Sequence, residues 1–136
     1  MAKPSILLAD DNSAILNHVS DLLDVDNHYE VVAAVLDGAA VLREYSRLKP
    51  DVIVLDISMQ VLSGIDVAQH LRDRGCNSKI VFLTVHDDSD FVNAAMGAGG
   101  LGYVLKTRLG TDLIPAINAV LSNKLFVSPS LLYARP

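Results

Sequence analysis

The chain has 136 residues, of which 51% are hydrophobic and 20% are charged, and its formal net charge is -5. This composition and length fit one globular domain and exclude a disordered chain, and a single cysteine excludes a disulfide scaffold. Eleven basic against sixteen acidic side chains argue against nucleic-acid binding through charge alone. No apolar run approaches the roughly 20 residues that span a bilayer, and the N-terminus lacks a signal peptide, so we expect a cytoplasmic protein without a membrane partner.

Five short apolar segments recur along the chain. Runs of Val, Ile and Leu without polar alternation are typical of parallel strands that are covered on both faces. Between these runs, apolar residues recur every three or four positions, as they do in amphipathic helices. The pattern therefore predicts five consecutive strand–helix units. The predicted strands are residues 6–9, 31–35, 52–55, 80–83 and 103–105.

Residues that can cap helices stand where the predicted helices begin and end. Gly75 and Gly99 are suited to the ends of two helices. Pro115 is expected in the first turn of the last helix, where a missing backbone N–H costs little. The predicted N-caps are Asn12 or Ser13, Asp37, Ser63 and Thr111.

The strand–helix alternation predicts an α/β fold. Right-handed crossovers place the helices on both faces of a parallel sheet. For five units we predict a doubly wound, flavodoxin-like, five-stranded sheet with strand order 2-1-3-4-5. Residues 1–123 would form this domain, and residues 124–136 would form a C-terminal tail or the start of a linker.

Polar side chains follow four of the five predicted strands. Asp10 and Asp11 come directly after the first strand, Asp56 after the third, Thr84 after the fourth and Lys106 after the fifth. Ligands bind to open α/β sheets outside the carboxyl ends of the strands, so we expect these side chains to meet there. Each of them alone is explained more simply as a helix cap or a solvated strand end. Their joint placement favours a functional site.

The chemistry of this group of residues can be derived from their charges. Clustered carboxylates repel one another unless a cation offsets the charge. Because Mg²⁺ takes carboxylate, water and phosphate oxygens, the three acids predict a Mg²⁺ site. A remaining carboxylate oxygen can attack phosphorus and form an aspartyl phosphate. Asp56 is the best nucleophile because its strand is central, while Lys106 and Thr84 can contact the phosphoryl oxygens.

Together these motifs resemble the receiver domain of two-component response regulators, which has the CheY-like form of this fold. The resemblance covers residues 5–124, and the combination of motifs is highly specific. The segments that carry it are residues 6–11, residues 50–56 followed by Met59 and Gly64, residues 83–84 and residues 98–106.

The resemblance implies a role for each acidic residue. Asp56 would accept a phosphoryl group from a phosphohistidine on a sensor histidine kinase. Asp11 would bind Mg²⁺ directly and Asp10 largely through water, with Asp56 and the backbone carbonyl of Ser58 as further ligands. Apart from gain and loss of its own phosphoryl group, we expect no enzymatic activity.

The resemblance also implies a conformational switch. Thr84 and Lys106 would contact the phosphoryl group, and Tyr103 would turn inward as Thr84 moves towards it. The phosphoryl group would shift the population of two conformations. The face formed by the fourth helix, fifth strand and fifth helix would then change its partner preference or form a homodimer.

Within the family, two segments resemble the receivers of NarL/LuxR-type transcriptional regulators. They are residues 102–106, which no proline follows, and residues 124–132. In such regulators a DNA-binding helix-turn-helix domain follows after a linker. We therefore expect control of transcription through a DNA-binding domain that these 136 residues do not include. A stand-alone receiver that acts through protein–protein contacts is the alternative.

Two other functions use similar residues or the same fold. A small Mg²⁺-dependent aspartyl phosphohydrolase would require a second acid two residues after the nucleophile, where Ser58 stands. A flavin-binding electron carrier would require a phosphate-binding loop of Ser, Thr and Gly after the first strand, where Asp10 and Asp11 stand. Both functions fit the sequence less well than a phosphoacceptor.

Overall fold

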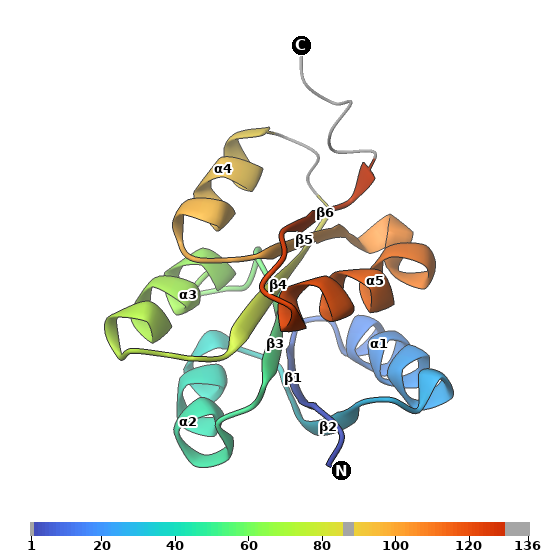
Figure 1. The fold of residues 1–136 in the computed structure, drawn as a ribbon. Coiled ribbons are helices and arrows are strands. Elements are labelled where there is room, and N and C mark those ends of the chain that lie inside the picture. The colour runs from blue at the N-terminus through green and yellow to red at the C-terminus, as the bar shows by residue number, and fades with distance from the viewer. Residues whose placement is uncertain (1, 86–88, 130–136) are drawn as a thin grey trace.

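The computed structural model describes residues 2–85 and 89–129. One parallel sheet lies between two layers of helices, with α1 and α5 on one face and α2, α3 and α4 on the other (Figure 1). Among the described residues, no helix combines the length and the apolar character needed to cross a bilayer. The strands are β1 (Ser5–Ala9), β2 (Glu30–Val35), β3 (Val52–Asp56), β4 (Lys79–Thr84), β5 (Gly102–Leu105) and β6 (Phe126–Val127). The helices are α1 (Ser13–Asp26), α2 (Gly38–Leu48), α3 (Gly64–Asp73), α4 (Ser89–Gly97) and α5 (Leu109–Leu121), and the 3₁₀ turn η1 (Lys106–Arg108) precedes α5.

The strand order confirms the predicted fold and extends it by one strand. The sheet has the order β2-β1-β3-β4-β5-β6, and all neighbours are parallel. The sixth strand comes from the segment that we expected to be a tail, and it pairs Phe126 with Gly102 and Val127 with Tyr103. A two-residue strand is too short for hydrophobic periodicity to reveal. Residues 130–136 of the predicted tail lie outside the described residues.

Two apolar clusters fix the sheet between its helix layers. In β1, Leu7 and Ala9 contribute to the cluster under α2, α3 and α4, whereas Ile6 and Leu8 contribute to the cluster under α1 and α5. Because both faces are covered, the interior positions of the central strands are apolar, which explains their unbroken apolar runs. Polar side chains are therefore left to the strand ends, where the candidate site lies.

Most of the predicted helix boundaries are confirmed. Asn12, Asp37 and Ser63 each accept a hydrogen bond from a backbone N–H two or three residues later. Gly75 and Gly99 follow α3 and α4 with φ angles of 74° and 98°, a left-handed conformation that favours glycine. These caps set the directions in which the helices leave the sheet.

The prediction for the start of the last helix is wrong. The helix α5 begins at Leu109 because the turn η1 leads directly into it, so Thr111 is not its N-cap. Pro115 consequently lies inside the helix and removes the hydrogen bond to the carbonyl of Thr111. Both residues are exposed, so water can replace the missing donor.

Candidate functional site

The structure brings the predicted strand-end residues to the carboxyl edge of the sheet. Asp10 and Asp11 follow β1, Asp56 and Thr84 end β3 and β4, and Lys106 follows β5. Asp10, Asp56 and Thr84 are almost fully buried, with exposed fractions of 1%, 2% and 1%. Asp11 is exposed and leaves one side of the group open to solvent.

One ammonium group bridges two buried carboxylates at this edge. Nζ of Lys106 lies 2.7 Å from Oδ2 of Asp10 and 3.3 Å from Oδ1 of Asp56. Backbone amides supply further donors: N of Asn12 donates to Oδ1 of Asp10 at 2.9 Å, and N of Ser58 donates to Oδ1 of Asp56 at 3.2 Å. Two buried negative charges therefore share a single positive one.

Burial and the neighbouring charges shift the pKa values of Asp56 and Lys106. Burial raises the pKa of Asp56 and the charge of Asp10 raises it further, and Lys106 and the amide of Ser58 offset only part of this increase. Burial alone would lower the pKa of Lys106, but the contacts with Asp10 and Asp56 outweigh it and raise that pKa. The site therefore lacks positive charge, and a bound cation would correct this deficit.

The acidic residues fit a Mg²⁺ ion. One oxygen from each of Asp10, Asp11 and Asp56 lies within 4.8 Å of the others. A donor set made only of oxygens, with one exposed carboxylate, suits an ion that keeps several waters. Bound there, Mg²⁺ would supply positive charge against the carboxylates and a phosphoryl group.

Gly64 allows the loop after β3 to return to the strand end. Its amide donates to the carbonyl of Ile57 at 2.8 Å. A Cβ at this position would lie 2.1 Å from the backbone oxygen of Asp56, so a larger residue would displace the loop. The sequence motif contains Gly64, but the close approach to Asp56 is visible only in the structure.

The predicted switch residues lie on adjacent strands. Thr84 pairs with Leu105 across β4 and β5, directly before Lys106. Tyr103 lies two positions earlier on β5, is fully buried and packs in the cluster under α4. Ser58 lies in the loop after β3 and is exposed. The structure thus brings Thr84, Lys106 and Asp56 to one edge and places Tyr103 within the sheet behind them.

A surface groove adjoins the acidic residues and was not predicted. Its volume is about 630 Å³, and its walls come from the loops after β1, β2 and β3 and from α2. Most of its apolar lining comes from loop residues, which carry no periodic signal in the sequence. The lining residues are Asp11, Leu36, Asp37, Gly38, Ala39, Arg43, Gln60, Val61 and Leu62.

Comparisons with known proteins agree with this geometry. Residues 6–118 match the response regulator receiver domain family. The nitrate/nitrite response regulator protein NarP of Escherichia coli is 40% identical over 114 residues, which cover 84% of this chain and 53% of NarP. The transcriptional regulatory protein YvfU of Bacillus subtilis is 34% identical over 128 residues, which cover 94% of this chain and 64% of YvfU. The chain thus spans between about half and two thirds of the length of these relatives.

A solved structure shows the same architecture. The LuxR-family two-component response regulator from Aurantimonas sp. SI85-9A1 superposes with a TM-score of 0.92 at 30% identity, covering 97% of this chain and 94% of that one. Receiver domains are generally phosphorylated on an aspartate, bind Mg²⁺ in an acidic pocket and act in signalling rather than as catalysts. Fold, site and sequence together show that the chain belongs to the response regulator receiver domain family, with relatives among the LuxR/NarL-type regulators.

Proposed function

We propose that Asp56 accepts a phosphoryl group from a phosphohistidine of a sensor histidine kinase. The observation that carries this proposal is the position of Asp56 at the end of the central strand. The residue is 2% exposed, and its carboxylate lies 3.3 Å from Nζ of Lys106 and belongs to a group of three carboxylates. The proposed compartment is the cytoplasm, where the phosphohistidine of such a kinase is available.

Each residue of the site has a proposed part in the transfer. An oxygen of Asp56 attacks phosphorus, the P–N bond to the donor histidine breaks, and the bonding electron pair stays on the imidazole nitrogen, which takes up a proton. Asp10, Asp11, Asp56 and the carbonyl of Ser58 would hold Mg²⁺. The ammonium of Lys106 then lies beside the new phosphoryl group and offsets its charge.

Phosphorylation would change the conformation at the ends of β4 and β5. The hydroxyl of Thr84 would donate a hydrogen bond to a phosphoryl oxygen, which favours one arrangement of the end of β4. Tyr103, on the adjacent strand, would respond as the switch residue. We further propose that the face of α4, β5 and α5 then changes its partner or forms a homodimer.

The proposed output is control of transcription. YvfU is named a transcriptional regulatory protein and NarP a response regulator, and both are longer than this chain. Contact with DNA would require a domain beyond the receiver. In this proposal, residues 1–123 form the phosphoacceptor unit, and residues 124–136 form a tail or linker whose strand β6 extends the sheet of that unit.

Intact-mass measurement tests the proposed phosphorylation. The protein is incubated with Mg²⁺ and phosphoramidate, and wild type is compared with Asp56→Asn. We expect one added phosphoryl group on wild type and none on the variant. Asp51→Asn is the matched control, because it changes an acid at the other end of the same strand and should leave labelling intact.

Three outcomes would contradict the proposal. One is the absence of any adduct on wild type, and another is equal labelling of Asp56→Asn. The third is continuous hydrolysis of many phosphate esters, which would favour a phosphohydrolase. A yellow chromophore that copurifies with the protein would instead favour a flavin carrier.

A further inference from the structure

Ser128 is a buried polar residue beyond α5 for which the proposed phosphoryl transfer assigns no role. It directly follows β6, and its exposed fraction is 0%. Its backbone amide donates to the carbonyl of Tyr103 at 2.9 Å. Its Oγ accepts a hydrogen bond from the amide of Leu105 at 3.1 Å. Ser128 therefore hydrogen-bonds the backbone of both Tyr103 and Leu105 in β5.

These two hydrogen bonds lie directly before the ammonium of the site. Leu105 ends β5, and Lys106 is the next residue along the chain. On the other side of β5, Leu105 pairs with Thr84 of β4. The end of β5 thus lies between Thr84 and Ser128. The side chain of the next residue, Lys106, contacts both Asp10 and Asp56.

A hydroxyl is needed at position 128 because the strand pairing stops before it. The register of β6 ends where Val127 meets Tyr103, so the buried amide of Leu105 lies beyond the last pair. A buried amide without an acceptor is unfavourable. The hydroxyl of Ser128 supplies that acceptor, in place of the backbone carbonyl that a longer strand would offer.

We propose that Ser128 is a positioning residue for Lys106, an inference that rests on the proposed phosphoacceptor function. By holding Tyr103 and Leu105, it fixes the end of β5 so that the ammonium lies between the two buried carboxylates. Ser128, which lies beyond α5, then belongs to the residues that position the groups of the site. Because energetic coupling is reciprocal, a change in the site also changes the strength of the hydrogen bonds between Ser128 and β5.

Phosphorylation kinetics of the full chain test this role. For Ser128→Ala we expect the maximal rate with phosphoramidate to fall roughly three- to tenfold, since small displacements of a positioned group slow a reaction strongly. The Mg²⁺ concentration at half-maximal rate should not rise, because Lys106 is not a metal ligand and a displaced ammonium leaves more uncompensated negative charge for Mg²⁺ to bind. Ser128→Thr keeps the oxygen and should recover most of the rate.

A control variant separates positioning from stability. Val127→Ala removes apolar packing from the same strand but leaves both bonds of Ser128 in place, so the rate should stay at the wild-type value. All rates are measured well below the lowest Tm of the set. If Ser128→Ala does not fold, Ser128→Cys replaces it, because sulfur is a weaker acceptor of similar size.

A double-mutant cycle shows whether Ser128 acts through Lys106. In a Lys106→Ala background, Ser128→Ala should cause no further loss of rate, or no further loss of beryllofluoride affinity if that rate is too slow to measure. Equal losses in both backgrounds, or an equal loss in Val127→Ala, would overturn the inference. A wild-type protein that is not labelled at all would instead refute the proposed function.

Discussion

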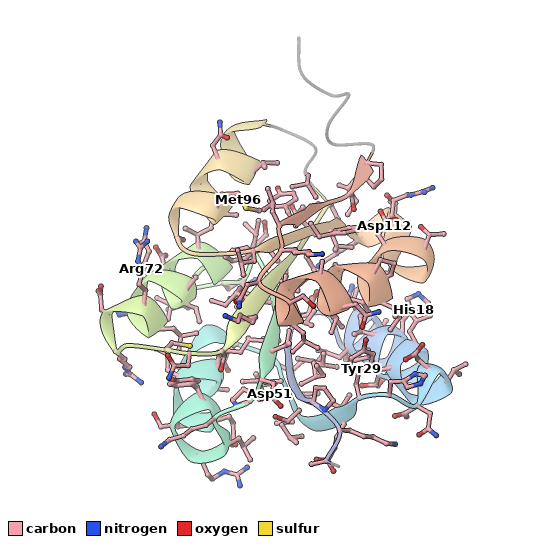
Figure 2. All side chains as sticks on the ribbon, viewed as in Figure 1. His18, Tyr29, Asp51, Arg72, Met96 and Asp112 are labelled. Carbon is pink, nitrogen blue, oxygen red and sulfur yellow. The ribbon has the colours of Figure 1, made fainter. Side chains whose placement is uncertain are left out.

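Strand β3 is flanked by an aspartate at each end, and the two lie in opposite environments. Asp51 precedes the strand at the amino edge of the sheet and is exposed (Figure 2). Its Oδ2 accepts hydrogen bonds from the amide of Ser5 at 2.8 Å and from its hydroxyl at 3.1 Å. Asp56 ends the strand, is buried, and faces the carboxylate of Asp10 and the ammonium of Lys106. Neutral donors satisfy the first carboxylate, whereas the second retains excess negative charge.

Other contacts at the two edges of the sheet also differ in whether their partners are neutral or charged. Near the amino edge, the hydroxyl of Tyr29 donates to Asn118 and the hydroxyl of Ser78 donates to the carbonyl of Pro50. These are neutral contacts that join elements distant in the sequence. At the carboxyl edge, charged groups meet and two of them have raised pKa values. The amino edge therefore contributes to stability, while the carboxyl edge carries the uncompensated negative charge that the proposed phosphoryl transfer would use.

The strongest test of this contrast removes the only ammonium that the structure shows between Asp10 and Asp56. In Mg²⁺-free buffer at pH 7, Lys106→Ala should lower the free energy of unfolding by on the order of 2–3 kcal/mol, because two buried carboxylates lose their counter-charge. Urea denaturation measures this change. Added Mg²⁺ should stabilise the variant more than it stabilises wild type.

Lys3→Ala is the control at the amino edge. The ammonium of Lys3 contacts the side chain of Asn27 at an exposed position. Its removal should change the free energy of unfolding by less than about 0.5 kcal/mol. Similar losses in both variants would remove the distinction between the two edges.

The sequence was sufficient to predict the site because its residues follow a simple rule. Asp10, Asp56, Thr84 and Lys106 each end or follow an apolar strand, and parallel strands bring such positions together. The parallel sheet could be predicted from the unbroken apolar runs, which are typical of covered parallel strands, and its order is confirmed as the flavodoxin-like order of five strand–helix units, with β6 added. Whether these residues perform the assigned roles stays a prediction that the phosphorylation experiments test.

Features that depend on very short elements or on contacts between residues distant in the sequence could not be predicted. The strand β6 has two residues, and the bond between Ser128 and Leu105 joins positions that no local pattern relates. The beginning of α5 was placed too late because Pro115 was interpreted by its propensity for the first turn, whereas an exposed proline is tolerated deeper in this helix. In these places tertiary contacts outweighed local preference.

A smaller effect is expected from neutralising Asp56. Burial and the charge of Asp10 raise its pKa in the folded state above that of the unfolded chain, near 3.9. The folded state therefore holds the proton more tightly, and the stability from this group is present below the unfolded pKa and lost as pH rises through the folded one. In Mg²⁺-free buffer at pH 7, Asp56→Asn should raise Tm by roughly 3–6 °C.

Thermal denaturation across pH checks the sign of this effect. The advantage of Asp56→Asn should shrink as pH falls through the raised pKa of Asp56, because the wild-type carboxyl group then also becomes neutral. A lower Tm for the variant at pH 7, or a difference that does not change with pH, would show that the carboxylate is already well compensated.

The smallest effect is expected at the other end of β3. Asp51→Ala removes the acceptor for the amide and hydroxyl of Ser5, so it should lower the free energy of unfolding by about 0.5–1 kcal/mol. Asp51→Asn keeps an acceptor oxygen and should lose less. Neither variant should change the rate of phosphorylation by phosphoramidate, because Asp51 holds β1 to β3 away from the reacting groups. A slower rate in Asp51→Ala at unchanged Mg²⁺ affinity would mean that strain at the amino edge passes along β3 to Asp56, and the two edges would then have to be treated as one coupled unit.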